Sequence, residues 1–571
     1  MESITKEFGE ITKDPSGIAE IVFNIKNWKN EGEALNDYLR ESKSCSWIKR
    51  KNVTITRVEE ELQTYEGSGC AILNTLTHCA RDKCLNSIAL LAAGEGSRLW
   101  GASATNAFVK ALTPLFRHTL LEQTIEQSVY LLSKAPQSDF TIVAGTDNIF
   151  IPSQPLATLN GTPFAESKGN LFFFSIEKKV LNERGELISE AILDSLEQLG
   201  IMIVDENASK PIEFIEKPPR QQILQVLQKY NKKSVFFNSF VFGFTRQGKA
   251  KMIELYSQKV PNAEENYFQR KDFDWSAHVL EPLSICSNPS LNSFEEKKNY
   301  WMARWNNEIF NEAEWLNLLL FANQFVNECG APVVISLGSD PIWYDTGLCS
   351  DLYDLYQETV SDNTLVRKSL RSWLHLPEEG NIVATKHYGN FEAKENAFVF
   401  NSCFKNGGSV GNKSIVVNST FEEETHIPDG WVIINSSIKS FSSLPNTSRA
   451  LFYSYISLCN HVEVRYDNSV FFTTFLDQQE DANSLAAEVT MRRYAGGLFP
   501  LHVVPKYKGN ENLFGHYNVN DNAGKPYLQQ TILGLQKPLS FKDLQSNTIP
   551  SLRGYLTYLS LCQCRNFVFL N

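Results

Sequence analysis

The spacing of apolar and polar residues changes along the chain. Before about residue 85, apolar positions recur at i, i+3 and i+4 between charged residues, as in RVEEELQTY (57–65), and this period is typical of amphipathic helices. From residue 86, short apolar runs such as FTIVAG (140–145) alternate with helical stretches such as LLEQTIEQSVYLLSKA (120–135). We therefore expect an N-terminal helical cap over residues 1–85 and an α/β domain with a mostly parallel sheet over residues 86–375.

A repeat of three matched copies follows the α/β domain. The copies read Phe398-Val-Phe-Asn-Ser, Ile415-Val-Val-Asn-Ser and Val432-Ile-Ile-Asn-Ser. Each offers a short apolar strand and then an Asn, which tolerates a left-handed turn. The pattern predicts about three coils of a β-solenoid within residues 376–480. A run of antiparallel strands with similar turns is the alternative, and residues 481–571 are expected to form a mixed β/α segment.

Length, charge and cysteine content narrow the class of protein. A chain of 571 residues is long enough for two to four domains. The net charge is −11 and no long run of Lys or Arg occurs, so nucleic acid is not an expected partner. No stretch approaches the roughly 20 apolar residues of a membrane span, and no membrane partner is expected. Eleven scattered cysteines fit free thiols in a reducing compartment, which favours the cytoplasm.

One group of potential zinc ligands lies in the segment that joins the first two regions. Its members are Cys70, His78, Cys79 and Cys84. No C-x-x-C spacing occurs among them, and residues 72–88 have the pattern of one helix. We favour ordinary helix residues over a metal site.

A glycine-rich turn, Gly94-Glu-Gly96-Ser97-Arg98-Leu99, follows an apolar run directly. Glycines there let backbone N–H groups approach a phosphate chain, and Arg98 could hold a triphosphate. The turn is not a P-loop, because no Gly-Lys-Ser/Thr ends it, and it lacks the third glycine of a dinucleotide fingerprint. A purely structural loop is the alternative.

An aspartate at the end of a predicted strand could hold a cation. Asp147 stands just past a strand, where α/β sheets present ligand-binding groups, although it could also simply open a turn. Mg²⁺ takes one or two protein carboxylates together with phosphate oxygens and water, so a carboxylate at this place suits that ion.

With the preceding residues, the turn reads LAAGEGSRL (91–99) and resembles the signature loop of the sugar-1-phosphate nucleotidyltransferases. The resemblance implies a Rossmann-like fold of the GT-A type, with nucleoside triphosphate and sugar 1-phosphate as substrates. It also implies that Arg98 neutralises the departing pyrophosphate and that Lys110, placed later than usual, contacts the phosphates. The implied nucleotide-binding residues are Ala92, Ala93, Gly94, Glu95, Gly96, Ser97 and Arg98.

Further segments resemble elements of that family in the same order. Glu216-Lys217-Pro resembles its Glu-Lys-Pro element, in which Glu meets sugar hydroxyls and Lys meets the sugar phosphate. Asn238 occupies the next strand, where an asparagine reads the sugar, or satisfies backbone groups in a purely structural role. The Asp147 segment and Trp343-x-Asp345-x-Gly347 resemble the two metal-binding elements, and the resemblance implies that Asp147 and Asp345 together hold a Mg²⁺ cofactor. Asp272 and Asp274 could also approach the site, but helix capping is at least as good an interpretation of both.

Within the superfamily, the chain looks most like the fucose-1-phosphate guanylyltransferases. A single helix separates the loop from the Asp147 strand, a solenoid-like segment follows, and a Leu498-Phe-Pro element occurs late. The implied reaction converts GTP and β-L-fucose 1-phosphate to GDP-fucose and pyrophosphate. A uridylyl- or thymidylyltransferase acting on another hexose or heptose 1-phosphate is the main alternative, and a catalytically inactive relative that binds nucleotide or sugar is another. A hexapeptide acyltransferase fits less well, because the repeat is too brief. Oligomeric state is left open.

Overall fold

The computed structural model describes the larger part of residues 1–501. The described ranges are 1–26, 39–40, 42, 45–60, 68–79, 86–91, 111, 114–116, 118–135, 139–156, 169–197, 199–205, 209–260, 265–270, 273–305, 310–346, 349–378, 380–434, 436–438, 441–443, 450–453, 456–457, 462–464, 470–473, 476–477, 490–494 and 497–501.

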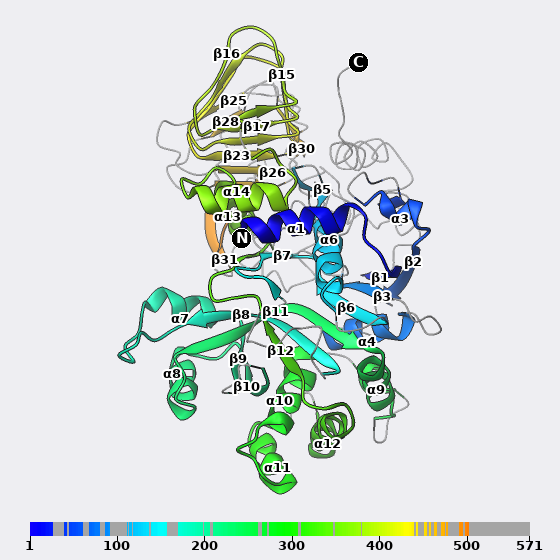
Figure 1. The fold of residues 1–571 in the computed structure, drawn as a ribbon. Helices are drawn as coiled ribbons and strands as arrows, with labels where there is room; N and C mark the ends of the chain where they lie inside the picture. Colours follow the sequence, from blue (N-terminus) through cyan, green and yellow to red (C-terminus); the bar gives the residue numbers. More distant parts are fainter. Residues whose placement is uncertain are drawn as a thin grey trace, which may run out of the picture.

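A nine-stranded sheet forms the centre of the α/β part (Figure 1). Its main path runs β10–β9–β11–β6–β3–β1–β2, β8 pairs with β11, and β12 pairs with β8. Seven of the nine strands run in one direction, and only β10 and β11 oppose them. The α/β class with a mostly parallel sheet is confirmed. The strands are β1 (Ile18–Lys26), β2 (Thr54–Glu60), β3 (Asn86–Leu91), β6 (Phe140–Gly145), β8 (Leu171–Lys179), β9 (Gly200–Val204), β10 (Pro211–Glu216), β11 (Ser234–Thr245) and β12 (Val333–Ser336).

The N-terminal region contributes strands as well as helices. Helices α1 (Glu2–Lys13), α3 (Trp47–Arg50) and α4 (Ser68–His78) lie there, but β1 and β2 pair with each other and β1 pairs with β3. The helical interpretation of RVEEELQTY is therefore wrong for its first four residues, which belong to β2. The β-branched residues just before them favour a strand. The spacing of apolar residues alone fits a helix as well as a strand, and hydrogen bonding to β1 stabilises the strand. The helix expected over residues 72–88 ends at His78.

Helices pack on both faces of the sheet, so alternate strand residues enter two separate cores. On one face, Ile142 of β6 packs with residues from α1 and α6 (Leu120–Leu132). On the other, its neighbour Val143 packs with residues from α4, α9 (Arg246–Tyr256) and α12 (Glu312–Cys329). A capping box between Thr119 and Glu122 starts α6. The remaining helices are α7 (Glu190–Leu196), α8 (Arg220–Lys229), η5 (Tyr267–Gln269), η6 (Ser276–Leu280), α10 (Glu281–Ser287), α11 (Phe294–Met302), α13 (Cys349–Glu358) and α14 (Thr364–Trp373).

The repeat forms a parallel β-solenoid, drawn in yellow in Figure 1. Phe398 pairs with Ile415, and Ile415 pairs with Val432, which is the register that the three copies predict. Both six-stranded rows are parallel throughout, and this excludes the antiparallel alternative. The first row consists of β14 (Ile382–Val383), β17 (Phe398–Phe400), β20 (Ile415–Val417), β23 (Trp431–Ile434), β26 (Ala450–Tyr453) and β29 (Val470–Thr473). The second consists of β15 (Lys386–His387), β18 (Cys403–Phe404), β21 (Thr420–Phe421), β24 (Ser437–Ile438), β27 (Ile456–Ser457) and β30 (Leu476–Asp477).

The Asn-Ser pairs make the corners of the coils. Asn401 and Asn418 adopt φ of +44° and +50°, as expected for left-handed turns. The Ser402 hydroxyl accepts from the backbone N–H of Ser419 at 3.1 Å, and the Ser419 hydroxyl accepts from that of Ser436 at 3.1 Å. The repeated serines therefore tie each coil to the next. Further short strands complete the coils: β16 (Phe391–Ala393), β19 (Gly408–Val410), β22 (Thr425–Ile427), β25 (Phe441–Ser443) and β28 (Val462–Val464).

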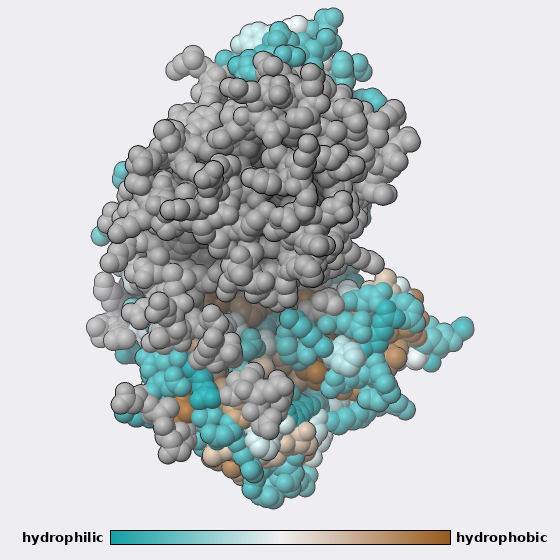
Figure 2. Space-filling model, turned by 180° about the vertical axis from the view of Figure 1, so that it is seen from behind, coloured by the Kyte–Doolittle hydropathy of each residue, from teal (hydrophilic) through white to brown (hydrophobic). Residues whose placement is uncertain are grey.

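Within the described residues, three small antiparallel sheets are not hydrogen-bonded into the central sheet or the solenoid. They pair β4 (Pro114–Leu115) with β5 (His118–Thr119), β7 (Asn148–Ile151) with β13 (Ile342–Asp345), and β31 (Thr490–Tyr494) with β32 (Gly497–Leu501). Among the described helices, none has the length and apolar character needed to cross a bilayer. On the side shown in Figure 2, the described surface is mainly hydrophilic, with small hydrophobic patches.

Candidate active site

The candidate site lies where the sheet splits. Residues 234–238 of β11 pair with β8, and Phe236 and Phe237 also pair with β9. Residues 241–244 pair with both β8 and β6. A bulge separates the two halves, and within it Phe240 has φ of +57°. The end of β6 and the beginning of β9 therefore meet beside this bulge. Crevices at points where neighbouring strands diverge are the usual ligand sites of open α/β sheets.

The glycine-rich loop leaves the sheet next to this split. Leu91, the last residue of β3, pairs with Gly145, the last residue of β6, and the Thr146 hydroxyl donates to the Leu91 carbonyl at 3.2 Å. Residues 92–110 follow Leu91 and lie outside the described residues. They include every predicted nucleotide-binding residue and the candidate cations Arg98 and Lys110. The structure therefore locates where the loop begins and leaves the roles of its residues as predictions.

The two candidate metal ligands lie on paired segments. In the small sheet of β7 and β13, Asp345 stands directly opposite Asn148, the residue after Asp147. The backbone N–H and the hydroxyl of Thr346 both donate to the Asp147 carbonyl, at 2.7 and 2.8 Å. Both aspartates are half-buried. Tertiary structure therefore brings the two chain segments that carry these aspartates side by side, and their role as metal ligands stays a prediction.

Small and aromatic residues fix the surroundings of this pair. A Cβ on Gly145 would lie 2.9 Å from Asp147 Oδ1 and 3.4 Å from the Phe240 ring, so the close approach requires glycine. The ring of Trp343 packs edge-on against Phe237 of the central sheet, with centroids 5.0 Å apart. The Trp of the Trp-x-Asp-x-Gly element thus anchors the small sheet to the large one, while Gly347 lies outside the described residues.

Glu216, Lys217 and Asn238 lie on the other side of the split. Glu216 is the last residue of β10 and pairs with Gly200. A Cβ added to Gly200 would lie 2.6 Å from Glu216 Oε2. Lys217 has φ of +46°, and its backbone N–H donates to the Leu199 carbonyl at 3.1 Å. Because Phe237 pairs with Ile201, one further step of the same register places Asn238 beside Gly200. The three candidate sugar-binding residues therefore lie on either side of β9, with Glu216 and Lys217 at the end of β10 and Asn238 on β11.

Asn238 also has the structural role that the sequence leaves open. Its Oδ1 accepts from the backbone N–H of Phe240 at 2.9 Å and so closes the bulge. The side-chain amide nitrogen takes no part in this contact. The bulge contact and a contact to a sugar are therefore compatible.

Asp274 caps a helix and also influences Glu216. Asp274 Oδ1 accepts from the backbone N–H of Ala277 at 2.9 Å, and its Oδ2 accepts from the Ser68 hydroxyl at 2.8 Å, which confirms the capping interpretation. Burial, and then the negative charge of Asp274, raise the pKa of Glu216 against the opposing effects of Lys217 and Ser276. Asp272 lies outside the described residues.

Where they are described, the potential zinc ligands lie on α4 or directly after it. Cys79 donates to the Thr75 carbonyl at 3.4 Å, one turn back along α4, and burial raises its pKa to about 12. Cys70 donates to the Arg270 carbonyl at 3.1 Å, and His78 Nδ1 lies 2.9 Å from the Asn74 carbonyl. A thiol this hard to ionise is a poor metal ligand. Cys84 lies outside the described residues.

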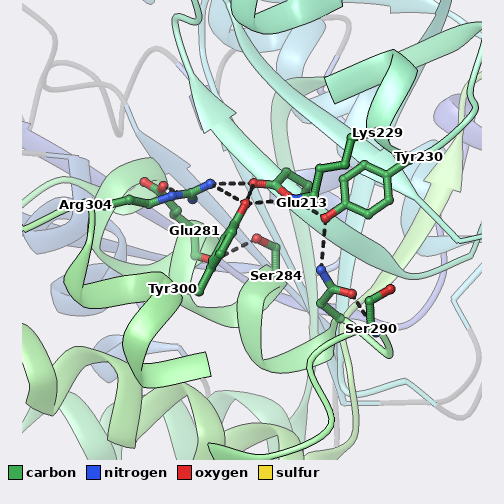
Figure 3. A network of polar contacts seen from close by, with 9 residues as sticks. Glu213, Lys229, Tyr230, Glu281, Ser284, Ser290, Tyr300 and Arg304 are labelled. Carbon is green, nitrogen blue, oxygen red and sulfur yellow. Dashed lines mark hydrogen bonds and ion pairs between the residues drawn. The ribbon is translucent and has the colours of Figure 1, made fainter. Parts of the chain in front are cut away.

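A buried network behind β10 has no counterpart in the sequence analysis (Figure 3). Glu213, which is 2% exposed, accepts from Tyr230 at 2.6 Å and from Lys229 at 3.0 Å. Arg304 and Tyr300 also donate to it, and Arg304 pairs with Glu281 as well. The network joins β10 to α8, α10 and α11, just before Glu216. Its members are widely separated charged residues and tyrosines, and only the fold shows that they meet.

Glu281 should give the protein a pH-dependent stability. Burial outweighs the attraction of Arg304 and raises its pKa from 4.5 to about 7. Because the folded state favours the protonated form, wild-type stability relative to Glu281→Gln should fall by about 3 kcal/mol as the pH rises from about 4.5 past 7. Urea unfolding of both proteins at several pH values measures this difference. A difference that does not vary with pH would contradict the prediction.

The chain has weak similarity to known proteins. No protein-family model matches the chain, and no curated protein matches it. Among solved structures, the chain is similar to a mannose-1-phosphate geranyltransferase from Thermus thermophilus, with 12% sequence identity and a TM-score of 0.24. The similarity covers 73% of this chain and 92% of that protein. A likeness this weak identifies neither family nor substrate.

Proposed function

We propose that the chain is a Mg²⁺-dependent sugar-1-phosphate nucleotidyltransferase. The observation that carries the proposal is the arrangement at the split in the sheet. Asp147 and Asp345 lie on paired segments beside the start of the glycine-rich loop, and Glu216, Lys217 and Asn238 lie across the β11 bulge from them. A nucleotide on the loop side and a sugar phosphate on the other side would meet at the carboxylates.

The donor set fits a magnesium ion. Two half-buried carboxylates supply hard oxygen ligands, and Mg²⁺ uses one or two such groups with phosphate oxygens and water. Asp147 and Asp345 would hold the ion, which supplies positive charge against the triphosphate when bound. Cys70 lies on α4, Cys79 directly follows it, and both thiols donate to backbone carbonyls there, so neither is a candidate ligand at this site.

The reaction needs no nucleophile from the protein. An oxygen of the sugar phosphate attacks the α-phosphorus in line, and the bond from that phosphorus to the β-phosphate oxygen breaks, with pyrophosphate taking the electron pair. Lys217 would orient the attacking phosphate, and Glu216 and Asn238 would bind the sugar. Arg98 and Lys110 would neutralise charge on the leaving pyrophosphate. Catalysis would rest on positioning and on charge.

Within this class we propose GTP and β-L-fucose 1-phosphate as substrates and GDP-fucose as product. In support, one helix, α6, separates the loop from the Asp147 strand among the described residues, a β-solenoid follows the α/β domain, and Leu498-Phe-Pro lies on β32. A uridylyl- or thymidylyltransferase is the alternative, because the Trp-x-Asp-Thr-Gly form of the second metal element resembles those enzymes.

A substrate panel tests both levels of the proposal. The full-length protein is incubated with Mg²⁺ and each nucleoside triphosphate against several sugar 1-phosphates, and pyrophosphate is measured. We expect release with at least one pair, and fastest release with GTP and β-L-fucose 1-phosphate. Pyrophosphate release only with another combination of nucleoside triphosphate and sugar 1-phosphate would show that the proposed substrates are wrong. Nucleotide binding without release for any pair would identify an inactive relative and overturn the enzyme proposal.

A further inference from the structure

The strand that follows Asp147 is held by a side chain as well as by its partner strand. The Gln127 amide of α6 donates through Nε2 to the Asn148 carbonyl at 2.9 Å, and its Oε1 accepts from the backbone N–H of Phe150 at 3.2 Å. One amide thus binds alternate residues of β7, as the backbone of a neighbouring strand would. Among the described residues, β7 has β13 as its strand partner, so Gln127 takes the place of a third strand.

A second contact fixes which way the Gln127 amide faces. The indole N–H of Trp373 donates to Gln127 Oε1 at 3.3 Å, so two N–H donors converge on that oxygen. Trp373 is itself held, because its ring stacks on Phe8 of α1 with centroids 3.6 Å apart. Gln127 and Trp373 are both buried, and water therefore cannot easily replace their hydrogen bonds. The amide is locked between α14 and β7.

We propose that Gln127 is a positioning residue for the two metal-binding carboxylates. It contacts Asn148, which follows Asp147 in the chain and pairs with Asp345, so one side chain controls the place of both aspartates. The inference rests on the proposed function. Mg²⁺ demands near-ideal octahedral geometry, and a small displacement of either carboxylate weakens its binding. Residues that orient metal ligands typically change metal affinity by about 10–100-fold when replaced.

The primary test is Gln127→Met, which keeps the length and packing of the side chain and removes both hydrogen bonds to β7. We expect the Mg²⁺ concentration for half-maximal activity to rise about tenfold, while KM for the sugar 1-phosphate changes less than twofold. Mn²⁺ affinity, measured by electron paramagnetic resonance with the nucleotide that is active in the panel, should fall by the same factor. This second readout does not depend on turnover.

Two further variants separate positioning from general damage. Gln127→Glu keeps an acceptor for Phe150 and loses the donor to Asn148, so it should shift metal affinity even if Gln127→Met folds poorly. Gln225→Met alters an exposed glutamine on α8 and should leave metal affinity and KM unchanged.

The outcomes distinguish the inference from the function on which it rests. Folded Gln127 variants with wild-type affinity for Mn²⁺ and Mg²⁺ would overturn the inference while leaving the nucleotidyltransferase intact. A wild-type protein that neither binds Mn²⁺ with nucleotide nor releases pyrophosphate would overturn the proposed function, and the inference with it. Weakened metal binding with an unchanged KM for the sugar phosphate supports both.

Discussion

Replacing Asp345 by Asn should lower turnover by at least about 1000-fold without unfolding the protein, since a lost metal carboxylate removes several kcal/mol of transition-state stabilisation. Asparagine has the same shape, and the backbone pairing of residue 345 with Asn148 is retained. The charge that would hold the cation is lost, while the packing of Trp343 on Phe237 persists. Initial rates of pyrophosphate release and thermal unfolding of the same samples measure the two effects.

Asp340→Asn is the matched control for this variant. Asp340 is exposed and lies on the same approach to β13, so its replacement changes net charge equally and should leave the rate unchanged. Lys217→Ala should also abolish turnover in a folded protein, because the group proposed to hold the sugar phosphate is gone. Wild-type rates in both Asp345→Asn and Lys217→Ala would show that the site lies elsewhere.

Glu213→Ala should lower the free energy of unfolding by about 3–5 kcal/mol, because it removes the carboxylate around which a buried network is built. Arg304 and Lys229 would lose an ionic partner, and the hydroxyls of Tyr230 and Tyr300 would lose an acceptor. Burial alone would raise the pKa of Glu213, but the two tyrosines and the two cations together lower it. Its stabilising effect is therefore present above the ordinary carboxyl pKa and lost as the pH falls below it.

Glu183→Ala provides the comparison for Glu213. Glu183 also pairs with two lysines, Lys179 and Lys233, but it is 77% exposed, and exposed ion pairs contribute little. Urea unfolding at pH 7 should show a clear loss for Glu213→Ala and no measurable change for Glu183→Ala. Similar effects of the two substitutions would mean that burial does not decide the strength of the network.

The spacing of apolar residues was sufficient to predict an element where one period, helical or strand, clearly dominated. The apolar run before the glycine-rich turn became β3, the helical stretch from Leu120 became α6, and FTIVAG became β6. The three Asn-Ser copies predicted the solenoid register residue by residue, because each coil repeats the same inward-facing aliphatics and the same left-handed corner. Each of the two rows of the solenoid has six strands, whereas the repeat predicted about three coils. The additional coils do not carry the repeated apolar-Asn-Ser sequence.

Sequence patterns did not predict the structure where a segment is stabilised by residues far away in the chain. The helical period of residues 57–65 competes with β-branched residues just before it, and only the pairing of β2 with β1 settled the outcome. The Glu213 network likewise joins residues from four elements, each of which resembles an ordinary surface charge or tyrosine in the sequence. Long-range contacts of this kind leave no periodic signal.

The sequence by itself determined the α/β class, the solenoid and the order of the candidate motifs, because these depend on residue type and spacing along the chain. Only the tertiary structure determined which other residues lie next to those motifs. Strand pairing set Asp345 opposite the residue that follows Asp147, the bulge in β11 divided the sheet between the two candidate substrate sides, and Gln127 reached β7 from a helix. These relations arise from packing between segments far apart in the chain, and such packing exists only in the folded protein.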